Sequence, residues 1–205
     1  MVAEPIPLAA RLGRAERREL LLDAAVAIVA SGSVDGLSME AVAERAGVSR
    51  PLVYKHFANR DELLGAVYRR EAAQLHDRLT AEVVAAPDLE GMFRALVHGA
   101  LRAADEQGGL FTALRAAGGW SPEVGREQRA RDRTTARGFA RRAVRELGIP
   151  EDTATTGVAL LLALIDPVLL RWRGDPTPAH AELLEETFMT IVSASLAAMA
   201  SGTRW

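Results

Sequence analysis

The amino-acid sequence predicts an all-α protein with a short N-terminal helical region and a longer C-terminal one. In segment after segment, apolar residues recur at intervals of three and four, as they do on one face of an α-helix. Glycine and proline stand between these segments, where helices end and begin. The chain has 205 residues, of which 49% are hydrophobic, and this is enough for one or two cores.

The composition excludes several classes of protein. There is no cysteine, so neither disulfides nor thiolate chemistry contributes. The formal net charge is −2, which excludes a generally basic nucleic-acid coat, so any affinity for nucleic acid must be local. Pro5 and Pro7 stand near the N-terminus, but no long apolar stretch follows a cationic start, and we expect no membrane-spanning segment and no membrane partner. The predicted location is the cytoplasm.

Residues 1–12 are predicted to form a flexible arm before a first helix from Arg14 to Ala30. The buried face of this helix is an apolar stripe of Leu21, Leu22, Ala25, Ile28 and Val29. Its start is basic, with Arg11, Arg14, Arg17 and Arg18. These arginines either contact nucleic-acid phosphates or form a solvated cationic face, and the sequence supports the two interpretations about equally.

A short helix is predicted to follow Ser38, which is placed to cap its N-terminus. Its buried face is made of apolar residues at helical spacing, namely Met39, Val42, Ala43 and Ala46. Gly47 supplies the left-handed backbone conformation that ends the helix, and Val48 then points back into the core. The turn to the next helix is therefore tight.

The next helix is predicted to keep its polar residues outside. Ser49 is placed to cap it, and Pro51 lies in its first turn, where a missing N–H costs nothing. Val53 and Phe57, four residues apart, form its buried side. The outward residues suit phosphates, base edges and a thymine methyl; they are Arg50, Pro51, Leu52, Tyr54, Lys55 and His56. A helix pair that only packs has no reason to leave such groups in solvent, so the pattern predicts a DNA-binding helix-turn-helix.

The helix that follows is predicted to begin at a capping box, in which Asn59 is followed three residues later by Glu62. Its apolar positions continue as far as Pro87, further than a small domain needs, and we expect it to bridge two domains. Beyond it, Asp88 caps another helix, and a long arginine-rich helix starts at Pro122 and ends at Gly148. Acidic residues are interleaved among those arginines, which favours a solvated face over a second nucleic-acid contact.

Five segments between Leu37 and Leu64 resemble the N-terminal domain of the tetracycline-repressor (TetR) family of transcriptional regulators. They are Leu37-Ser38-Met39, Val42-Ala43, Ala46-Gly47-Val48-Ser49, Val53-Tyr54-Lys55-His56-Phe57 and Arg60-Asp61-Glu62-Leu63-Leu64. The resemblance implies a helix-turn-helix domain in residues 13–60 and a helical ligand-binding and dimerisation domain in residues 61–205. The predicted DNA contacts are Ser38, Ser49, Arg50, Pro51, Leu52, Tyr54, Lys55, His56 and Arg60.

Two C-terminal segments are more apolar than one chain can cover. Val158–Leu170 is almost continuously apolar, and Thr187–Met199 mixes large apolar residues with small ones. Packing each segment against its two-fold copy forms a four-helix interface, so we predict a homodimer, which the TetR resemblance also implies. The predicted interface residues are Leu161, Ile165, Phe188, Ile191, Val192 and Leu196.

Asp166 stands inside the first of these apolar segments, directly before Pro167. A charge there is costly unless a partner or a ligand meets it, which makes Asp166 a candidate ligand anchor. Its alternative role is to cap a kink caused by the proline. The candidate pocket walls are the aromatic residues Phe93, Phe111, Trp120, Phe139 and Trp172, although aromatics at helical spacing more often belong to a core. The TetR resemblance implies a small-molecule effector, mostly apolar, that releases the DNA.

Two functions from different classes remain open at this point. The first is a ligand-responsive transcriptional repressor that binds a pseudo-palindromic operator in double-stranded DNA as a homodimer. The second is a small-molecule-binding or interaction protein of the same fold without DNA function. Catalysis, a cofactor and a metal site are not expected, since neither a nucleophile elbow nor a phosphate-binding glycine loop occurs. The histidines are also dispersed, at His56, His76, His98 and His180.

Overall fold

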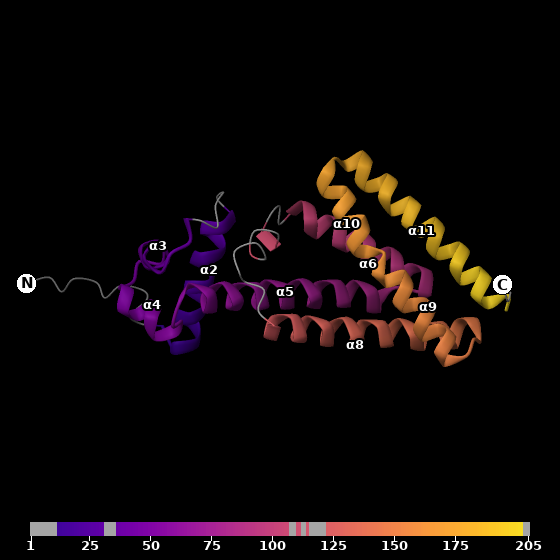
Figure 1. The fold of residues 1–205 in the computed structure, drawn as a ribbon, viewed down its shortest axis with the longest axis horizontal. Helices are drawn as coiled ribbons and strands as arrows, with labels where there is room; N and C mark the ends of the chain where they lie inside the picture. Colours follow the sequence, from indigo (N-terminus) through magenta and orange to yellow (C-terminus); the bar gives the residue numbers. More distant parts are fainter. Residues whose placement is uncertain (1–11, 31–35, 107–109, 112–113, 115–121, 203–205) are drawn as a thin grey trace, which may run out of the picture. The chain divides into compact units, whose positions relative to one another are not determined.

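The computed structural model describes residues 12–30, 36–106, 110–111, 114 and 122–202 (Figure 1). Every regular element in these ranges is a helix, which confirms the predicted all-α fold. The helices are α2 (Arg14–Ala30), α3 (Met39–Arg45), α4 (Arg50–His56), α5 (Arg60–Ala85), α6 (Leu89–Glu106), α8 (Pro122–Leu147), α9 (Glu151–Ala163), α10 (Ile165–Gly174) and α11 (Pro178–Ala200).

The chain divides into two compact units. Unit 1 comprises Met1–Ala73 and Gln107–Gly125, and unit 2 comprises Gln74–Glu106 and Arg126–Trp205. The division falls within α5, which contributes residues to both units, whereas the sequence analysis placed a domain boundary at residue 60, where α5 begins. Each unit has its own buried core.

The core of unit 1 is built by the apolar faces of α2, α3, α4 and the first part of α5. On α2, the predicted stripe is buried except for Ile28, which is partly buried against the same core. The side chains that it meets come from the other three helices and include Met39, Val42, Ala43, Val53, Phe57, Leu63, Leu64 and Val67. Fully burying one such side chain is worth about 1.5–3 kcal/mol. These contacts therefore fix which face of α4 is left for solvent.

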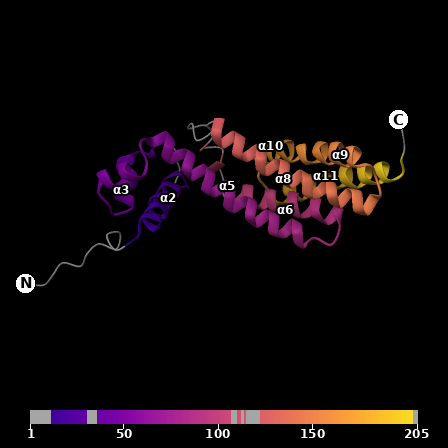
Figure 2. The same ribbon diagram turned by 90° about the horizontal axis from the view of Figure 1, so that it is seen from below.

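The core of unit 2 is centred on aromatic side chains. Phe93 on α6 packs edge-on against Phe139 on α8, with ring centroids 4.7 Å apart, and lies 6.3 Å from Phe188 on α11. All three rings are buried. In this unit α6 lies beside α11 and α10, as both views show (Figures 1 and 2).

The apolar segment 158–170 forms two helices rather than one. Pro167 has no N–H to donate to the carbonyl of Ala163, and α9 ends at that residue. The chain turns at Leu164, whose N–H donates to Leu161 at 3.2 Å, and α10 resumes with Val168 donating to Leu164 at 3.1 Å. The predicted proline kink is therefore confirmed.

Two helical stretches of unit 2 are long and apolar enough to cross a membrane, by length and composition only. They are Glu151–Gly174, with a mean hydropathy of 1.9, and Pro178–Ala200, with 1.3. The expectation that no segment reaches this length was therefore wrong. Both stretches also supply buried core side chains such as Val158 and Phe188, and core helices of soluble proteins pass the same test, so the stretches do not indicate a membrane protein.

Candidate DNA-binding surface

A tight turn joins α3 to α4. The hydroxyl of Ser38 accepts a hydrogen bond from the N–H of Ala41 at 3.0 Å, which confirms the predicted cap of α3. Gly47 has φ +65°, the left-handed conformation that glycine adopts without strain. The N–H of Val48 then donates to the carbonyl of Ala43 at 2.9 Å and closes the turn. This is the geometry of a helix-turn-helix.

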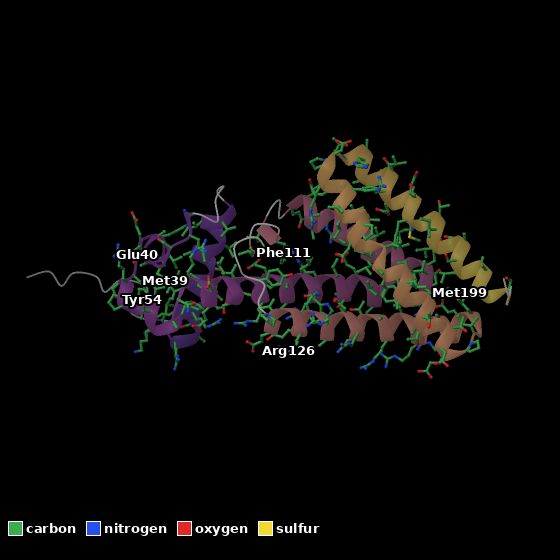
Figure 3. The ribbon with its side chains drawn as sticks, in the orientation of Figure 1. Met39, Glu40, Tyr54, Phe111, Arg126 and Met199 are labelled. Carbon is green, nitrogen blue, oxygen red and sulfur yellow. The ribbon has the colours of Figure 1, made fainter. Side chains whose placement is uncertain are left out.

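The orientation of α4 is set by two buried side chains. Val53 and Phe57 are 0% and 1% exposed, as their four-residue spacing predicted. The other side of the helix faces solvent, and Tyr54 is 50% exposed (Figure 3). The remaining predicted contacts on this helix are exposed or partly exposed, namely Arg50, Pro51, Leu52, Lys55 and His56. Unit 1 thus presents a polar, cationic helix face on a rigid support.

Ser49 stands at the N-cap position of α4, but its side chain does not cap the helix. The prediction that it does was wrong for a local reason. A cap accepts from the N–H of the second or third helical residue, but the second is Pro51, which has none. The third is Leu52, whose N–H donates to the backbone carbonyl of Ser49 at 3.0 Å. The Ser49 hydroxyl is exposed and is not used by the helix that it precedes.

Cations from α2 surround the C-terminal end of α4. Partial burial lowers the pKa of His56, and the charges of Arg14, Arg17, Lys55 and Arg18 lower it further. Arg18 lies over the ring of Phe57, 5.1 Å from its centroid. Arg14, Arg17 and Arg18, for which the sequence left two interpretations open, therefore add positive charge beside α4, whereas Arg11 lies outside the described residues. Their spacing of three and four residues on α2 was the sequence signal for this shared face.

Arg50, the first residue of α4, is paired with an acid that the sequence analysis did not single out. One guanidinium nitrogen of Arg50 lies 3.5 Å from a carboxylate oxygen of Glu40 on α3. Both side chains are exposed, by 65% and 41%. The two residues are ten positions apart and lie on different helices, so the periodicity of either helix does not predict that they pair.

Arg60 has a structural role that the sequence analysis did not foresee. Its Nε donates to the carbonyl of Leu37 at 2.8 Å and ties the start of α5 to the segment before α3. The predicted capping box is present nearby, since Asn59 accepts from the N–H of Glu62 at 2.9 Å. The Glu62 carboxylate in turn accepts from the N–H of Ala58 at 2.7 Å, one residue before the cap. Replacing Arg60 would therefore perturb the fold as well as any phosphate contact.

Arg70 on α5 binds three carboxylates and anchors α2. It lies 2.7 Å from Asp23, 2.8 Å from Glu71 and 3.2 Å from Glu19. Glu71 is the buried member of this group, at 8% exposure. Burial alone lowers the pKa of Arg70, but its hydrogen bonds to Glu71, Asp23 and Glu19 outweigh this and raise that pKa above its usual value. The guanidinium is thus held charged between α2 and α5.

The predicted ligand-binding residues do not line one cavity. Phe93, Phe139 and Trp172 fill the core of unit 2, and Phe111 packs edge-on against Tyr68 in unit 1, at 5.6 Å. Trp120 lies outside the described residues. Asp166 is exposed, so the argument that burial makes its charge costly does not hold within one chain. The aromatics cluster because they are core residues, which was the alternative for aromatics at helical spacing.

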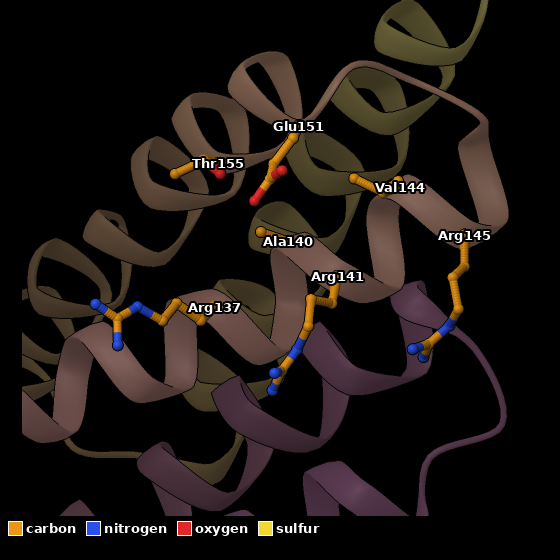
Figure 4. A pocket seen from close by; sticks show the side chains of 7 residues that line it. All are labelled: Arg137, Ala140, Arg141, Val144, Arg145, Glu151 and Thr155. Atoms are coloured by element: carbon orange, nitrogen blue, oxygen red, sulfur yellow. The ribbon is translucent and has the colours of Figure 1, made fainter.

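A hollow of about 530 Å³ lies in unit 2, but its walls are not the aromatic ones that we expected (Figure 4). Its lining carries three arginines of α8 and the residues of α9 that face them, and consists of Arg137, Ala140, Arg141, Val144, Arg145, Glu151 and Thr155. None of the predicted ligand-binding residues belongs to it.

Most of the predicted dimer contacts are buried inside the protomer. Leu161, Phe188, Val192 and Leu196 belong to the core of unit 2, and Ile165 is partly buried against it. Only Ile191, at 45% exposure, is substantially open. The large exposed apolar side chains on the same helices are instead Leu160 (66%), Leu170 (67%) and Leu183 (59%). Four of the six predicted interface residues therefore lie in the core of their own chain and present little surface to a second copy.

Comparison with known proteins agrees with this geometry. Residues 21–67 match the family model described as "Bacterial regulatory proteins, tetR family". The transcriptional activator FasR of Mycolicibacterium smegmatis is 42% identical over 65 residues, which are 32% of this chain and 30% of FasR. The nicotine-responsive transcriptional repressor HdnoR of Paenarthrobacter nicotinovorans is 31% identical over 88 residues, 43% of each chain. The matched part spans less than half of either relative.

The fold is also found over the whole chain. A solved structure from Pseudomonas aeruginosa PAO1, 21% identical, superposes with a TM-score of 0.77 and covers 97% of this chain and 99% of that one. At this identity the likeness concerns the arrangement of the helices alone. The family model, in contrast, matches only residues 21–67, which contain α3, the turn and α4.

Proposed function

Because the chain belongs to the tetR family of bacterial regulatory proteins and carries the DNA-binding domain of that family, we propose that it is a cytoplasmic transcriptional repressor. It binds a pseudo-palindromic operator in double-stranded DNA as a homodimer, and a small molecule releases it. The observation that carries this proposal is the solvent-facing side of α4. Arg50, Tyr54 and Lys55 are exposed there above the buried Val53 and Phe57.

The chemistry of this face suits the major groove of B-DNA. Arg50 is the first residue of α4, and the N-terminal residues of a recognition helix contact base edges. A guanidinium can form a bidentate pair with guanine. Tyr54 and Lys55 offer a hydroxyl and an ammonium for phosphates, and the Ser49 hydroxyl is available for another. The arginines of α2 add positive charge beside them. In a homodimer, two such helices about 34–36 Å apart enter successive major grooves.

The proposal is tested by selecting bound sequences from a random DNA pool and by a lysine footprint. Lys55 is the only lysine in the chain, so an acetylating reagent modifies this side chain and the N-terminal amine alone. Selected DNA is expected to protect Lys55 from acetylation, with the N-terminal amine as the internal control. A protein that enriches no sequence and whose Lys55 stays equally reactive with DNA present contradicts the proposal.

The homodimer is supported by the apolar residues that unit 2 leaves in solvent. Leu160 on α9 and Leu170 on α10 are about two-thirds exposed, and Leu183 and Ile191 line α11. Symmetric pairing with a second copy would remove these side chains from water on both chains. These four residues replace the buried ones as the proposed interface.

The proposed effector is a mostly apolar small molecule bound among the helices of unit 2. The relative HdnoR, whose name records a response to nicotine, supports such a role. Phe93, Phe139 and Trp172 are buried, so a ligand reaches them only by separating these side chains. By thermodynamic reciprocity, operator DNA must weaken the binding of a releasing effector by the same factor by which the effector weakens DNA binding. Calorimetry of effector binding with and without operator measures that factor.

A further inference from the structure

The DNA-binding surface of unit 1 contains a carboxylate at a place where phosphates are expected to approach. Glu40 is in the first turn of α3, two residues after the N-cap Ser38, and its side chain is 41% exposed. Glu40 and Tyr54 belong to the two helices that flank the turn (Figure 3). The charges that act on His56 near the end of α4 are cationic, and they belong to Arg14, Arg17, Arg18 and Lys55. An acid on a surface that binds a polyanion repels the phosphates of DNA of any sequence.

The partner of Glu40 is the residue proposed to read a base. The Glu40 carboxylate lies 3.5 Å from the Arg50 guanidinium, so in the free protein much of the charge of Arg50 is balanced. The Arg50 and Glu40 side chains are 65% and 41% exposed, and an ion pair this exposed changes a folding or binding equilibrium by no more than about fivefold. Arg50 gives up this partner at little cost when another acceptor replaces it.

Two kinds of acceptor compete for Arg50 on DNA. A phosphate is present at every step and carries no sequence information, whereas the O6 and N7 atoms of guanine form a bidentate pair at specific positions only. A carboxylate beside the guanidinium repels a phosphate but adds much less repulsion toward the uncharged base edge. Discrimination can arise from such a repulsive element as well as from attractive contacts.

We propose that Glu40 is a positioning and specificity residue, which holds Arg50 away from phosphates and so reserves it for a guanine in the major groove. The proposal rests on the DNA-binding function proposed above. It assigns to α3 a role in sequence discrimination that acts through α4. Glu40 thereby lowers affinity for random DNA and raises the ratio of operator to random binding.

The test compares Glu40→Gln with the wild type on DNA selected by the wild-type protein and on a scrambled duplex. Glutamine keeps the size of the side chain and removes its charge. Random-DNA affinity is expected to rise by roughly two- to fivefold, because one repulsive charge is lost. The operator-to-random ratio is expected to fall by up to the same factor, roughly two- to fivefold, because the uncharged base edge gains less from the loss of the carboxylate. Since Arg50 becomes free for a phosphate, the slope of log K against log salt steepens by about one.

The matched control is Glu44→Gln on the same helix. Glu44 is exposed and makes no ion pair with any residue in the described part of the chain. This variant changes the net charge equally and is expected to leave base preference unchanged. A double-mutant cycle with Arg50→Gln separates an effect through Arg50 from a direct one: in that background, Glu40→Gln is expected to change the specificity ratio by less than about twofold.

Each result decides between the proposals. A wild-type protein that selects no sequence removes the proposed DNA-binding function itself. If the wild type selects an operator and Glu40→Gln leaves random affinity, specificity ratio and salt slope unchanged, the role of Glu40 is wrong. A Glu40→Gln variant that folds, as judged by circular dichroism, but loses operator and random binding together also overturns it. Restoration of the wild-type ratio by Glu40→Asp supports the role of the charge.

Discussion

Replacing Arg70 with methionine is expected to loosen α2 from α5 in unit 1. Methionine preserves most of the length and apolar stem of the side chain while removing the charge that three carboxylates share. The loss is greatest for Glu71, whose side chain is 10% exposed and whose partner Arg70 is 14% exposed. Breaking a buried pair by removing one partner typically costs about 3–5 kcal/mol, because the other charge is left without compensation.

The exposed carboxylates add little to that figure. Glu19 and Asp23 are 55% and 69% exposed, and such pairs are worth about 0–1 kcal/mol each. The residual solvent access of Glu71 reduces its own penalty, so the expected total is about 3 kcal/mol. If α2 opens locally, this corresponds to a roughly hundredfold faster exchange of its protected backbone amides, which hydrogen–deuterium exchange measures.

The control variants separate charge compensation from general damage. Arg69→Met changes the same type of residue at the adjacent position, and no described residue forms an ion pair with Arg69, so we expect less than about 0.5 kcal/mol. Arg70→Met combined with Glu71→Met removes both buried charges and should recover most of the lost stability. The reasoning is refuted if this double variant is as unstable as Arg70→Met, or if Arg70→Met leaves exchange in α2 unchanged.

Three other perturbations give distinct outcomes. Gly138→Ala in α8 should raise the free energy of unfolding by about 1 kcal/mol, since nothing lies within 4 Å of an added Cβ. Gly99→Ala should not raise it, because the added Cβ would collide with the Leu79 side chain. Urea unfolding measures the free energy for both variants. Leu160→Glu should convert dimers to monomers in light scattering with the helical circular dichroism retained, and an unchanged dimer would remove Leu160 from the interface. The lowered pKa of His56 leaves the imidazole neutral near pH 7, and a nearby phosphate favours its protonation. Gel shifts should therefore show operator affinity rising as pH falls from about 8 to 6, and rising less in His56→Gln. In the free protein, the lowered pKa of His56 reduces the free energy of unfolding as pH falls below about 6.5.

The helix-turn-helix was predictable because its determinants are local. Ser38 and Gly47 act through neighbours at most five residues away, so their positions encode the cap and the turn. The four-residue spacing of Val53 and Phe57 marks the buried side of α4. Ser49 shows the limit of that logic. Its residue type suits a cap, but the proline two positions later removes one donor and the backbone carbonyl takes the other. Residue preference alone does not include such competition.

The C-terminal helices were harder because α11 is apolar on more than one side. Phe188, Val192 and Leu196 recur every four residues and face the core of their own chain, while Leu183 and Ile191 face outward. Periodicity identifies both faces but does not say which one the same chain covers. That choice depends on α10, which directly precedes α11, and on α6, which packs against α11 from a distant part of the sequence. The long-range ion pairs of Arg70 were beyond sequence reasoning for the same reason.

The distribution of charge on α2 connects the stability of unit 1 with DNA binding. At the start of the helix, Arg14, Arg17 and Arg18 lie near enough to His56 to lower its pKa. Further along, Glu19 and Asp23 lie against Arg70. If Arg70 is lost, two carboxylates lose their counter-charge on the helix that carries the cationic surface. Arg70→Met should therefore weaken binding to operator and random DNA alike, with the specificity ratio unchanged, whereas Glu40→Gln should alter that ratio. Gel shifts in which Arg70→Met alters the specificity ratio and Glu40→Gln leaves it unchanged would contradict both predictions.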